Sequence, residues 1–451
     1  MEFFLTILEP MQLRNFPNTV AVILILAVAF VTTGLLLTES QAQVSSVVPA
    51  SESVSSSGSL DPLLERGKYL ATIGNCVSCH TYKDGPKFGG GVPFHVSGGP
   101  FSEPFGTIYS TNISPDIETG IGDWTEEQFA YAMRAGVSAN GSHLYPAFPY
   151  SAFSKITKED MSAIYAYIMS LEPVNYTPPD NEMPFPFNIR LALFFWNFLF
   201  ADNELYRTDP EQSDEWNRGA YLTEGLGHCS SCHTPRNFFL AEDKSLAMSG
   251  GTYFDVVEED KIRKWSAVNL TSASTGMAKW SETDIANYLR TGHSFRAGTF
   301  GPMNEVIINS TQFLKEEDAK AMAVYIKSLA PIERNTDQTL SSEEEAHGLA
   351  IYEEHCEECH LQSGRGAFLK APPVSGSAIV QAPDASSLIN VILYGADVPA
   401  EGPTPFGAWE DMGSYRDKLS DEDVAALSNY LRTAWENKGG RVTPKEVAKQ
   451  R

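Results

Sequence analysis

The sequence predicts an all-α fold made of three tandem domains that share one plan. Three observations predict it: a Cys-x-x-Cys-His pentad occurs three times, a glycine-containing helical pattern precedes each pentad, and an amphipathic helix closes each repeat. A length of 451 residues is also enough for about three domains. The pentads use all six cysteines of the chain, and they lie at 76–80, 229–233 and 356–360.

An export signal or N-terminal membrane anchor is expected before the first repeat, over residues 1–42. Val20–Leu37 is 18 residues long and carries no charge, which suits a signal peptide and is just long enough to span a bilayer if it is retained. The small residues Ser40 and Ala42 fit a cleavage site after this run. The serine-rich stretch 43–60 is expected to be a linker. The body of the protein is therefore expected to be exported.

Each repeat is expected to open with a short helix that contains a glycine. The three openings read RGKYLATIGN, RGAYLTEGLGH and HGLAIYEEH, and each stands directly before a pentad. A glycine leaves room for another helix to approach closely, so Gly67, Gly219 and Gly348 are expected at helix crossings.

A middle helix is expected next in each repeat. In the first two repeats it starts with a capping-box pattern and ends at a glycine, whereas the third copy, over 386–396, is looser. The capping and terminating residues are Thr125, Gln128 and Gly136 in the first repeat, and Ser281, Asp284 and Gly292 in the second.

A final helix is expected to close each repeat, over 157–171, 315–329 and 420–434. Apolar residues recur on one face of each of these segments, which indicates core packing. Ser420 and Asp423 are expected to cap the third copy.

The segments between the repeats set the expected domain boundaries. The segment 176–208 contains an apolar stretch, Leu191–Ala201, of only 11 residues, which is too short to cross a membrane. It is expected either to pack between domains or to dock on a partner subunit or the membrane surface. The expected order is domain 1 at 61–175, this hydrophobic segment at 176–208, domain 2 at 209–332, an acidic linker at 333–345, domain 3 at 346–436 and a polar tail at 437–451.

The pentads predict three covalently bound haem c groups. Two thiols one helical turn apart can join the two vinyl groups of a haem, and the adjacent imidazole can then bind the iron. Structural zinc would need further ligands near each pair, and a disulfide scaffold suits much shorter secreted chains. The cysteines expected to hold haem are Cys76, Cys79, Cys229, Cys232, Cys356 and Cys359, and the iron-binding histidines are His80, His233 and His360.

A second axial ligand is expected between the middle and final helices, usually a methionine thioether. Met303 and Met412 occupy that gap in the second and third repeats. In the first repeat the gap reads NGSHLYPAFPYSAF, with Phe148 and no methionine. The first iron is therefore expected either to be bound by His143, with His95 a weaker alternative, or to be five-coordinate.

Longer stretches point beyond haem binding. The three pentads, the RGxYL openings, and the stretches LYPAFPY, FPFNIR and GPMNEVI resemble the trihaem cytochrome c subunits of bacterial membrane-bound dehydrogenases. The resemblance covers 61–435. It implies that His80, His233 and His360 are proximal iron ligands and that Met303 and Met412 are distal ones.

The resemblance also implies an electron relay rather than an enzyme. A partner dehydrogenase subunit of quinoprotein, flavoprotein or molybdenum type would oxidise the substrate, and electrons would pass to membrane ubiquinone or another respiratory acceptor. The expected location is the periplasmic face of the bacterial inner membrane. The alternative is a stand-alone haem enzyme or gas sensor that uses an open first iron. A net charge of -24 argues against a nucleic-acid partner.

Overall fold

A computed structural model describes residues 61–258, 261–334, 338–368, 370–396 and 412–451. The expected signal or anchor at 1–42 and the expected linker at 43–60 lie outside these described residues. From Leu60 onward the chain forms one compact unit. Within the described part, no helix is both long and apolar enough to cross a membrane.

The first repeat opens and closes with the two helices that the sequence predicts. Helix α2, Pro62–Ile73, is capped by the side chain of Asp61, and helix α6, Lys158–Met169, by that of Thr157. The middle helix has the expected capping box and the left-handed glycine at its end. The remaining helices of this repeat are α3 (Cys76–His80), α4 (Glu126–Ala135) and α5 (Tyr150–Phe153).

The second repeat follows the same order with one irregularity. It has one residue more than the first repeat between the helix glycine and the first pentad cysteine, namely Gly219 to Cys229 against Gly67 to Cys76. A π-helical turn, η1 (Tyr221–Leu226), takes up this extra residue. Its helices are α8 (Asp214–Ala220), α9 (Ser230–His233), α10 (Glu282–Thr291), α11 (Pro302–Asn309) and α12 (Glu316–Ser328), with short 3₁₀ turns at Lys244–Leu246 and Thr311–Phe313.

The third repeat is longer at both ends than expected. Helix α13 begins at Ser342, inside the stretch expected to be an acidic linker. The expected polar tail folds as helix α17, Pro444–Gln450, and buries Val442 and Val447 in the core of this repeat. The apolar contact of those two valines holds the tail in place. The other helices are α14 (Glu357–His360), α15 (Ser386–Tyr394) and α16 (Asp421–Thr433).

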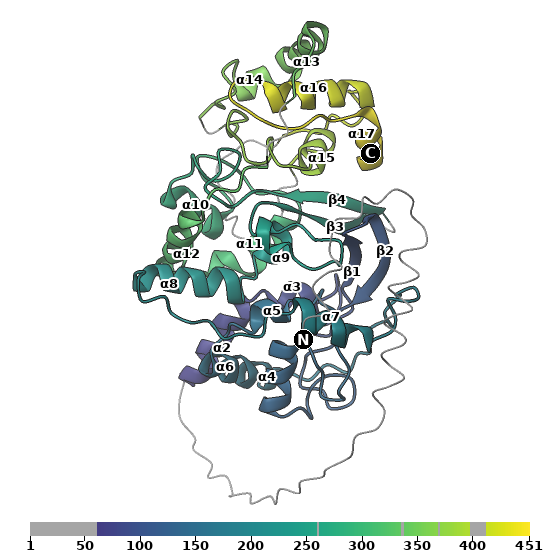
Figure 1. The fold of residues 1–451 in the computed structure, drawn as a ribbon, viewed down its shortest axis with the longest axis vertical. Helices are drawn as coiled ribbons and strands as arrows, with labels where there is room; N and C mark the ends of the chain where they lie inside the picture. Colours follow the sequence, from purple (N-terminus) through teal and green to yellow (C-terminus); the bar gives the residue numbers. More distant parts are fainter. Residues whose placement is uncertain (1–60, 259–260, 335–337, 369, 397–411) are drawn as a thin grey trace, which may run out of the picture. The chain divides into compact units, whose positions relative to one another are not determined.

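Two antiparallel hairpins show that the all-α prediction is incomplete. One pairs β1 (Pro93–Gly98) with β2 (Phe101–Tyr109), and the other pairs β3 (Gly251–Glu258) with β4 (Lys261–Ala267) (Figure 1). Each hairpin follows a pentad and precedes a middle helix. The strand signals are short and outside the repeated helical motifs: two glycines at the first turn, and a short run rich in β-branched and aromatic residues at the start of the second hairpin.

The helix glycines lie at close helix crossings, as predicted. A Cβ atom on Gly67 would lie 1.9 Å from the carbonyl oxygen of Ala163 in α6, and one on Gly219 would lie 1.9 Å from that of Ala321 in α12. In the third repeat the corresponding distance from Gly348 to the Ala426 oxygen in α16 is 2.6 Å. Any side chain at these positions would therefore force the first and last helices of a repeat apart.

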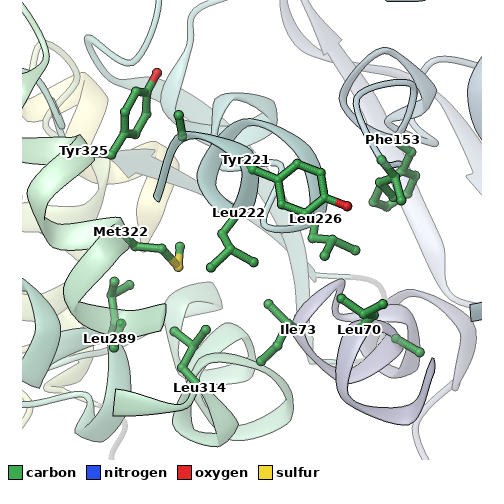
Figure 2. Packing of buried hydrophobic residues seen from close by; sticks show 14 of the residues in the cluster. Leu70, Ile73, Phe153, Tyr221, Leu222, Leu226, Leu289, Leu314, Met322 and Tyr325 are labelled. Atoms are coloured by element: carbon green, nitrogen blue, oxygen red, sulfur yellow. The ribbon is translucent and has the colours of Figure 1, made fainter. Parts of the chain in front are cut away.

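The first two repeats share one hydrophobic core. Figure 2 shows Leu70 and Ile73 of the first repeat facing Leu222 and Leu226 of the second. The buried cluster to which they belong also draws on the final helices of both repeats, including Met322. The third repeat has a separate cluster built around its own helices. The first two repeats are therefore packed as one body.

Polar contacts cross between the first two repeats. Asp160 in α6 is 1% exposed; it accepts hydrogen bonds from Arg66 of its own repeat and, at 2.7 Å, from the hydroxyl of Tyr221 of the other. Equivalent residues repeat this arrangement in the opposite direction. Asp318 in α12 accepts from Arg218 at 2.7 and 2.8 Å and from the Tyr69 hydroxyl at 2.6 Å.

Among its described residues, the third repeat does not take part in such an exchange. Its equivalent aspartate, Asp423, lies 3.1 Å from Nε2 of His347, which stands where the other repeats have arginine. Ala350 stands where they have the tyrosine. The third repeat is joined to the second by other contacts, mainly from β4 to α15, where Ser266 and Ser387 hydrogen-bond to each other.

Candidate haem-binding sites

The three pentad histidines are held in one orientation. In each, Nδ1 lies at hydrogen-bonding distance from a backbone carbonyl oxygen, which can only accept, so Nδ1 carries the proton. Nε2 is then left with its lone pair, the form that binds a metal. The pairs are His80 with Thr111 at 2.7 Å, His233 with Val268 at 2.7 Å and His360 with Pro372 at 3.0 Å.

Burial favours the neutral form of these imidazoles. It lowers the pKa of His80, His233 and His360, and the hydrogen bond to the carbonyl only partly offsets the effect. At neutral pH all three are therefore uncharged and able to coordinate iron.

In the described part of the chain, no disulfide joins the pentad cysteines. Burial raises the pKa to about 11 for Cys76 and to about 12 for Cys79, Cys229 and Cys356, so these thiols stay protonated near neutral pH. The short helix α3 presents Cys76 and Cys79 one turn apart, with His80 next to them.

The pentad residues fit a haem better than a packed core. Burial shifts the pKa of the three histidines and of Cys76, Cys79, Cys229, Cys232 and Cys356, yet none of the pentad cysteines and histidines is fully covered by neighbouring side chains. Two thiols and an imidazole oriented by its Nδ1 hydrogen bond are the donor set that haem c needs. The group supplies an iron that takes up and releases one electron.

The ligand loops of the first two repeats can be aligned by their backbone hydrogen bonds. The amide of Leu144 donates to the Gly136 carbonyl at 2.7 Å, and the amide of Thr299 donates to that of Gly292 at 2.8 Å. Counting four residues onward from each amide places Phe148 in the position that Met303 holds. The structure thus agrees with the spacing argument that the first repeat has a phenyl ring where the second has a thioether.

Met303 lies in the first turn of α11 and packs against the shared core. The preceding Gly301 has a φ of +58°, and a Cβ there would lie 2.7 Å from the ring of Trp265. Met412 is the first described residue after 397–411, and its carbonyl oxygen packs on Gly395, which has a φ of +83°. Their roles as iron ligands remain predictions.

The histidine candidates for the first iron differ in their surroundings. In the described part of the chain, Nδ1 of His143 is buried without a hydrogen-bond partner, while its carbonyl accepts from Arg190 at 2.8 Å. His95 lies on β1, with Nδ1 3.2 Å from the Thr107 hydroxyl. Nε2 of His95 is likewise buried without a partner in the described part of the chain, so the ring nitrogens do not separate the two candidates. His143 stays the leading candidate because it lies in the expected ligand loop, and ligation by either residue is still a prediction.

Two asparagines that support the sites were missed from the sequence. Asn112 and Asn269 each follow the residue whose carbonyl oxygen contacts the pentad histidine, and both are almost fully buried. Their side-chain amides donate to backbone carbonyls beyond the final helices, at 2.7 Å to Val174 and 2.9 Å to Ile332. The signal was present as a repeated pattern, TNIS at 111–114 and VNLT at 268–271.

The fold and these sites define a c-type cytochrome, and comparison with known proteins agrees. The cytochrome c family model matches residues 64–172 and 345–435. The chain is 36% identical over 410 residues to the gluconate 2-dehydrogenase cytochrome c subunit of Pantoea cypripedii, covering 87% of this chain and 90% of that one. It is 37% identical over 404 residues to the cytochrome c subunit of the quinone alcohol dehydrogenase of Komagataeibacter europaeus, covering 86% and 84%.

A third relative is larger. The chain is 38% identical over 377 residues to a nicotinate dehydrogenase subunit of Pseudomonas putida, a match that spans 82% of this chain and 30% of that protein. From the coverage of the gluconate and alcohol relatives, the chain belongs to the family of cytochrome c subunits of dehydrogenase complexes. It is an electron-transfer subunit rather than a catalytic one, which sets aside the alternative of a stand-alone haem enzyme.

Proposed function

We propose that this chain relays electrons from the catalytic subunit of a dehydrogenase complex to ubiquinone or another respiratory acceptor, using three covalently bound haem c groups. The threefold recurrence of one arrangement, a cysteine pair with a histidine whose Nδ1 is fixed by a carbonyl, carries the proposal. The partner is of quinoprotein, flavoprotein or molybdenum type, because relatives of this chain serve gluconate, alcohol and nicotinate dehydrogenases.

The protein's own residues hold and tune the three sites. The pentad cysteines attach the group, and the carbonyls of Thr111, Val268 and Pro372 fix the proximal imidazoles. Met303 and Met412 are proposed as thioether ligands, which raise the reduction potential of the second and third sites. The first site takes His143 or stays five-coordinate.

Membrane association is part of the proposal, at the periplasmic face of the inner membrane. Helix α7, Ala192–Phe200, has no buried residue, and Phe198 is 82% exposed. Its Trp196 indole donates to the Phe239 carbonyl at 2.8 Å, which joins α7 to the exposed rings of Phe238 and Phe239. An uncharged aromatic surface of this kind supports contact with the interfacial region of a lipid bilayer.

The test of the proposal is purification of the chain from its native membrane, followed by haem analysis. We expect a stoichiometric dehydrogenase subunit to accompany it, and a denatured mass increased by three haem groups. The partner's substrate should reduce all three haems, and ubiquinone should then reoxidise them. Isolation of the chain alone with substrate-oxidising activity would contradict the proposal, and two or fewer covalent haems would contradict the assigned sites.

The distal ligands can be tested in the same preparation. Met303→Ala and Met412→Ala should each lower one reduction potential and remove one methionine-to-iron absorption band, because the thioether stabilises ferrous iron. Met161→Ala is the control, since Met161 is only 1% exposed and lies in the core. Persistence of both bands in the double variant would show that the ligands are elsewhere.

A further inference from the structure

The pentads of the first two repeats are covered by each other's elements. The hydroxyl of Ser78, inside the first pentad, accepts a hydrogen bond at 2.8 Å from Asn309 of α11. Ser310 donates at 2.8 Å to the carbonyl of Ile73, just before that pentad. In return, the ring of Phe153 in the first repeat lies 5.5 Å from that of His228, just before the second pentad.

The same face of the third repeat has no such cover in the described part of the chain. The main packing partners of α13 and α14 there are each other and α16, all within the third repeat. Next to the pentad, Leu361 is 40% exposed and Phe368 is 80% exposed. Both belong to the loop that wraps the third pentad, since the Ala367 amide donates to the Cys359 carbonyl at 2.9 Å.

This uncovered face is strongly acidic. Seven glutamates and no lysine or arginine occur from Glu343 to Glu358. Glu353, Glu354 and Glu358 are exposed beside the pentad. Cations offset part of this charge. The Lys370 ammonium lies 2.8 Å from the Glu358 carboxylate, Arg441 pairs with Glu344, and Arg365 is exposed in the loop after the pentad. Glu353 and Glu354 remain the acidic pair closest to the pentad. The surface beside the third pentad therefore has an apolar centre, made by Leu361 and Phe368, with exposed glutamates next to it.

We propose that this face of the third repeat docks a small cationic electron-transfer protein. Leu361 and Phe368 would form the apolar contact, and the glutamates would attract and orient the basic partner. The same charge disfavours anionic lipid and a second copy of this chain as occupants. One electron passes between the third site and the partner's redox centre, and no bond is made or broken. The inference rests on the proposed relay and adds where, and with what kind of protein, it exchanges electrons.

The experiment uses the complete complex and a basic single-haem cytochrome c as the probe. Electron exchange is followed by stopped-flow absorbance over a range of ionic strength. The variant Glu353→Gln/Glu354→Gln/Glu358→Gln is compared with Glu127→Gln/Glu172→Gln/Glu211→Gln, which removes the same charge from exposed positions outside the third repeat. We expect the first variant to slow exchange roughly tenfold at low salt and to flatten its salt dependence, because steering by charge is lost. The control should stay within about twofold of the wild type.

The outcomes separate this inference from the relay itself. Equal rates for the two triple variants, or an unchanged salt dependence, would overturn the docking face while leaving the relay in place. Carbodiimide cross-linking adds a second measurement, and links from Glu353 or Glu354 to probe lysines are expected. Links from these glutamates to the dehydrogenase subunit alone would also overturn the proposal. Failure of the partner's substrate to reduce any haem would contradict the relay instead.

Discussion

At the scale of single residues, the sequence predicts the haem-binding chemistry, but it does not reveal the backbone carbonyls that orient the pentad histidines. The pentads consist of adjacent residues, so their spacing alone predicts the haem-binding cysteines and the proximal histidines. The carbonyls of Thr111, Val268 and Pro372 come from loops that fold back over distances of up to 35 residues, and backbone acceptors leave no mark in the sequence. The supporting Asn112 and Asn269 did leave a repeated pattern.

Phe148→Met should convert the first site into one like the second. Because Phe148 and Met303 hold equivalent positions in aligned loops, the new thioether should reach the iron, add a methionine-to-iron absorption band and raise the potential of the first haem. Spectroelectrochemistry of the full chain is the measurement. Met303→Phe is the matched control and should remove the corresponding band from the second site. If Phe148→Met leaves the spectrum unchanged, the loop alignment does not extend to the ligand.

At the scale of elements, helices with strong caps were predicted to within a residue or two, and irregular elements were missed. The capping boxes at Thr125, Ser281 and Ser420 start their helices as expected. The two hairpins and the π-turn η1 were not predicted, because their local signals are weak and their register depends on packing. The sequence shows that the second repeat has one extra residue before its pentad. It does not show that a π-helical turn accommodates this residue.

Gly67→Ala should destabilise the holoprotein by about 2–3 kcal/mol, because the added methyl group would overlap the Ala163 carbonyl at a packed helix crossing. Urea unfolding monitored by circular dichroism gives the value. Gly225→Ala is the control, since its nearest contact would be an ordinary 3.6 Å. A change of less than about 0.5 kcal/mol in the free energy of unfolding of Gly67→Ala would mean that α2 and α6 can move apart without destabilising the protein.

The Asp318 network predicts a pH dependence. Burial alone would raise the pKa of Asp318, but hydrogen bonds from Arg218 and Tyr69 outweigh it, so the pKa lies below the usual 3.8. A carboxylate with a lowered pKa stabilises the fold above its unfolded pKa, and the stabilisation is lost as the pH falls through the folded value. Asp318→Asn should therefore cost about 1.5–3 kcal/mol at neutral pH and progressively less below about pH 4.

Urea midpoints of the wild type and Asp318→Asn, measured from about pH 7 to about pH 3, test this expectation. The two curves should converge at the acid end. Asp423→Asn is a useful comparison, because Asp423 lies beside His347 and has no tyrosine partner from another repeat. If the urea midpoints of wild type and Asp318→Asn differ by the same amount at every pH, the ionisation of Asp318 does not contribute to stability.

At the scale of the whole molecule, the sequence predicts three repeats but not the way in which they combine. The pentads predict three equivalent domains, whereas the structure fuses the first two through a common core and leaves the third with its own. The shared core depends on residues such as Leu222 and Ile73. From the sequence alone, these residues cannot be distinguished from core residues of a single repeat. Contacts between distant segments have no local pattern, so they could not be derived from spacing.

A chain that ends after Arg334 should still be a folded two-haem protein. The core cluster of the first two repeats takes only Ala378 from the third, and the joint at β4 is largely polar. We expect normal export, two covalent haems and cooperative unfolding, checked by mass spectrometry and calorimetry. A shorter chain that ends after Met169 lacks the second repeat's part of the shared core. We expect this chain to be degraded rather than to accumulate as a folded protein. Loss of both haems from the first chain would show that the third repeat is needed for the others to fold.

The crossed tyrosine–aspartate contacts have a consequence for how the chain matures. Tyr69 can form its hydrogen bond only after Asp318, 249 residues later in the chain, has been synthesised. Asp160 likewise requires Tyr221, which is 61 residues later. If the chain is exported and its pentads carry haem, as proposed, its N-terminus emerges first, and the first repeat is exposed before the second has appeared. The cysteines of the first pentad are then accessible for haem attachment before Asn309 and Ser310 of the second repeat pack beside them. The sequence separation of these contacts thus favours attachment at the first pentad before the two repeats pack together.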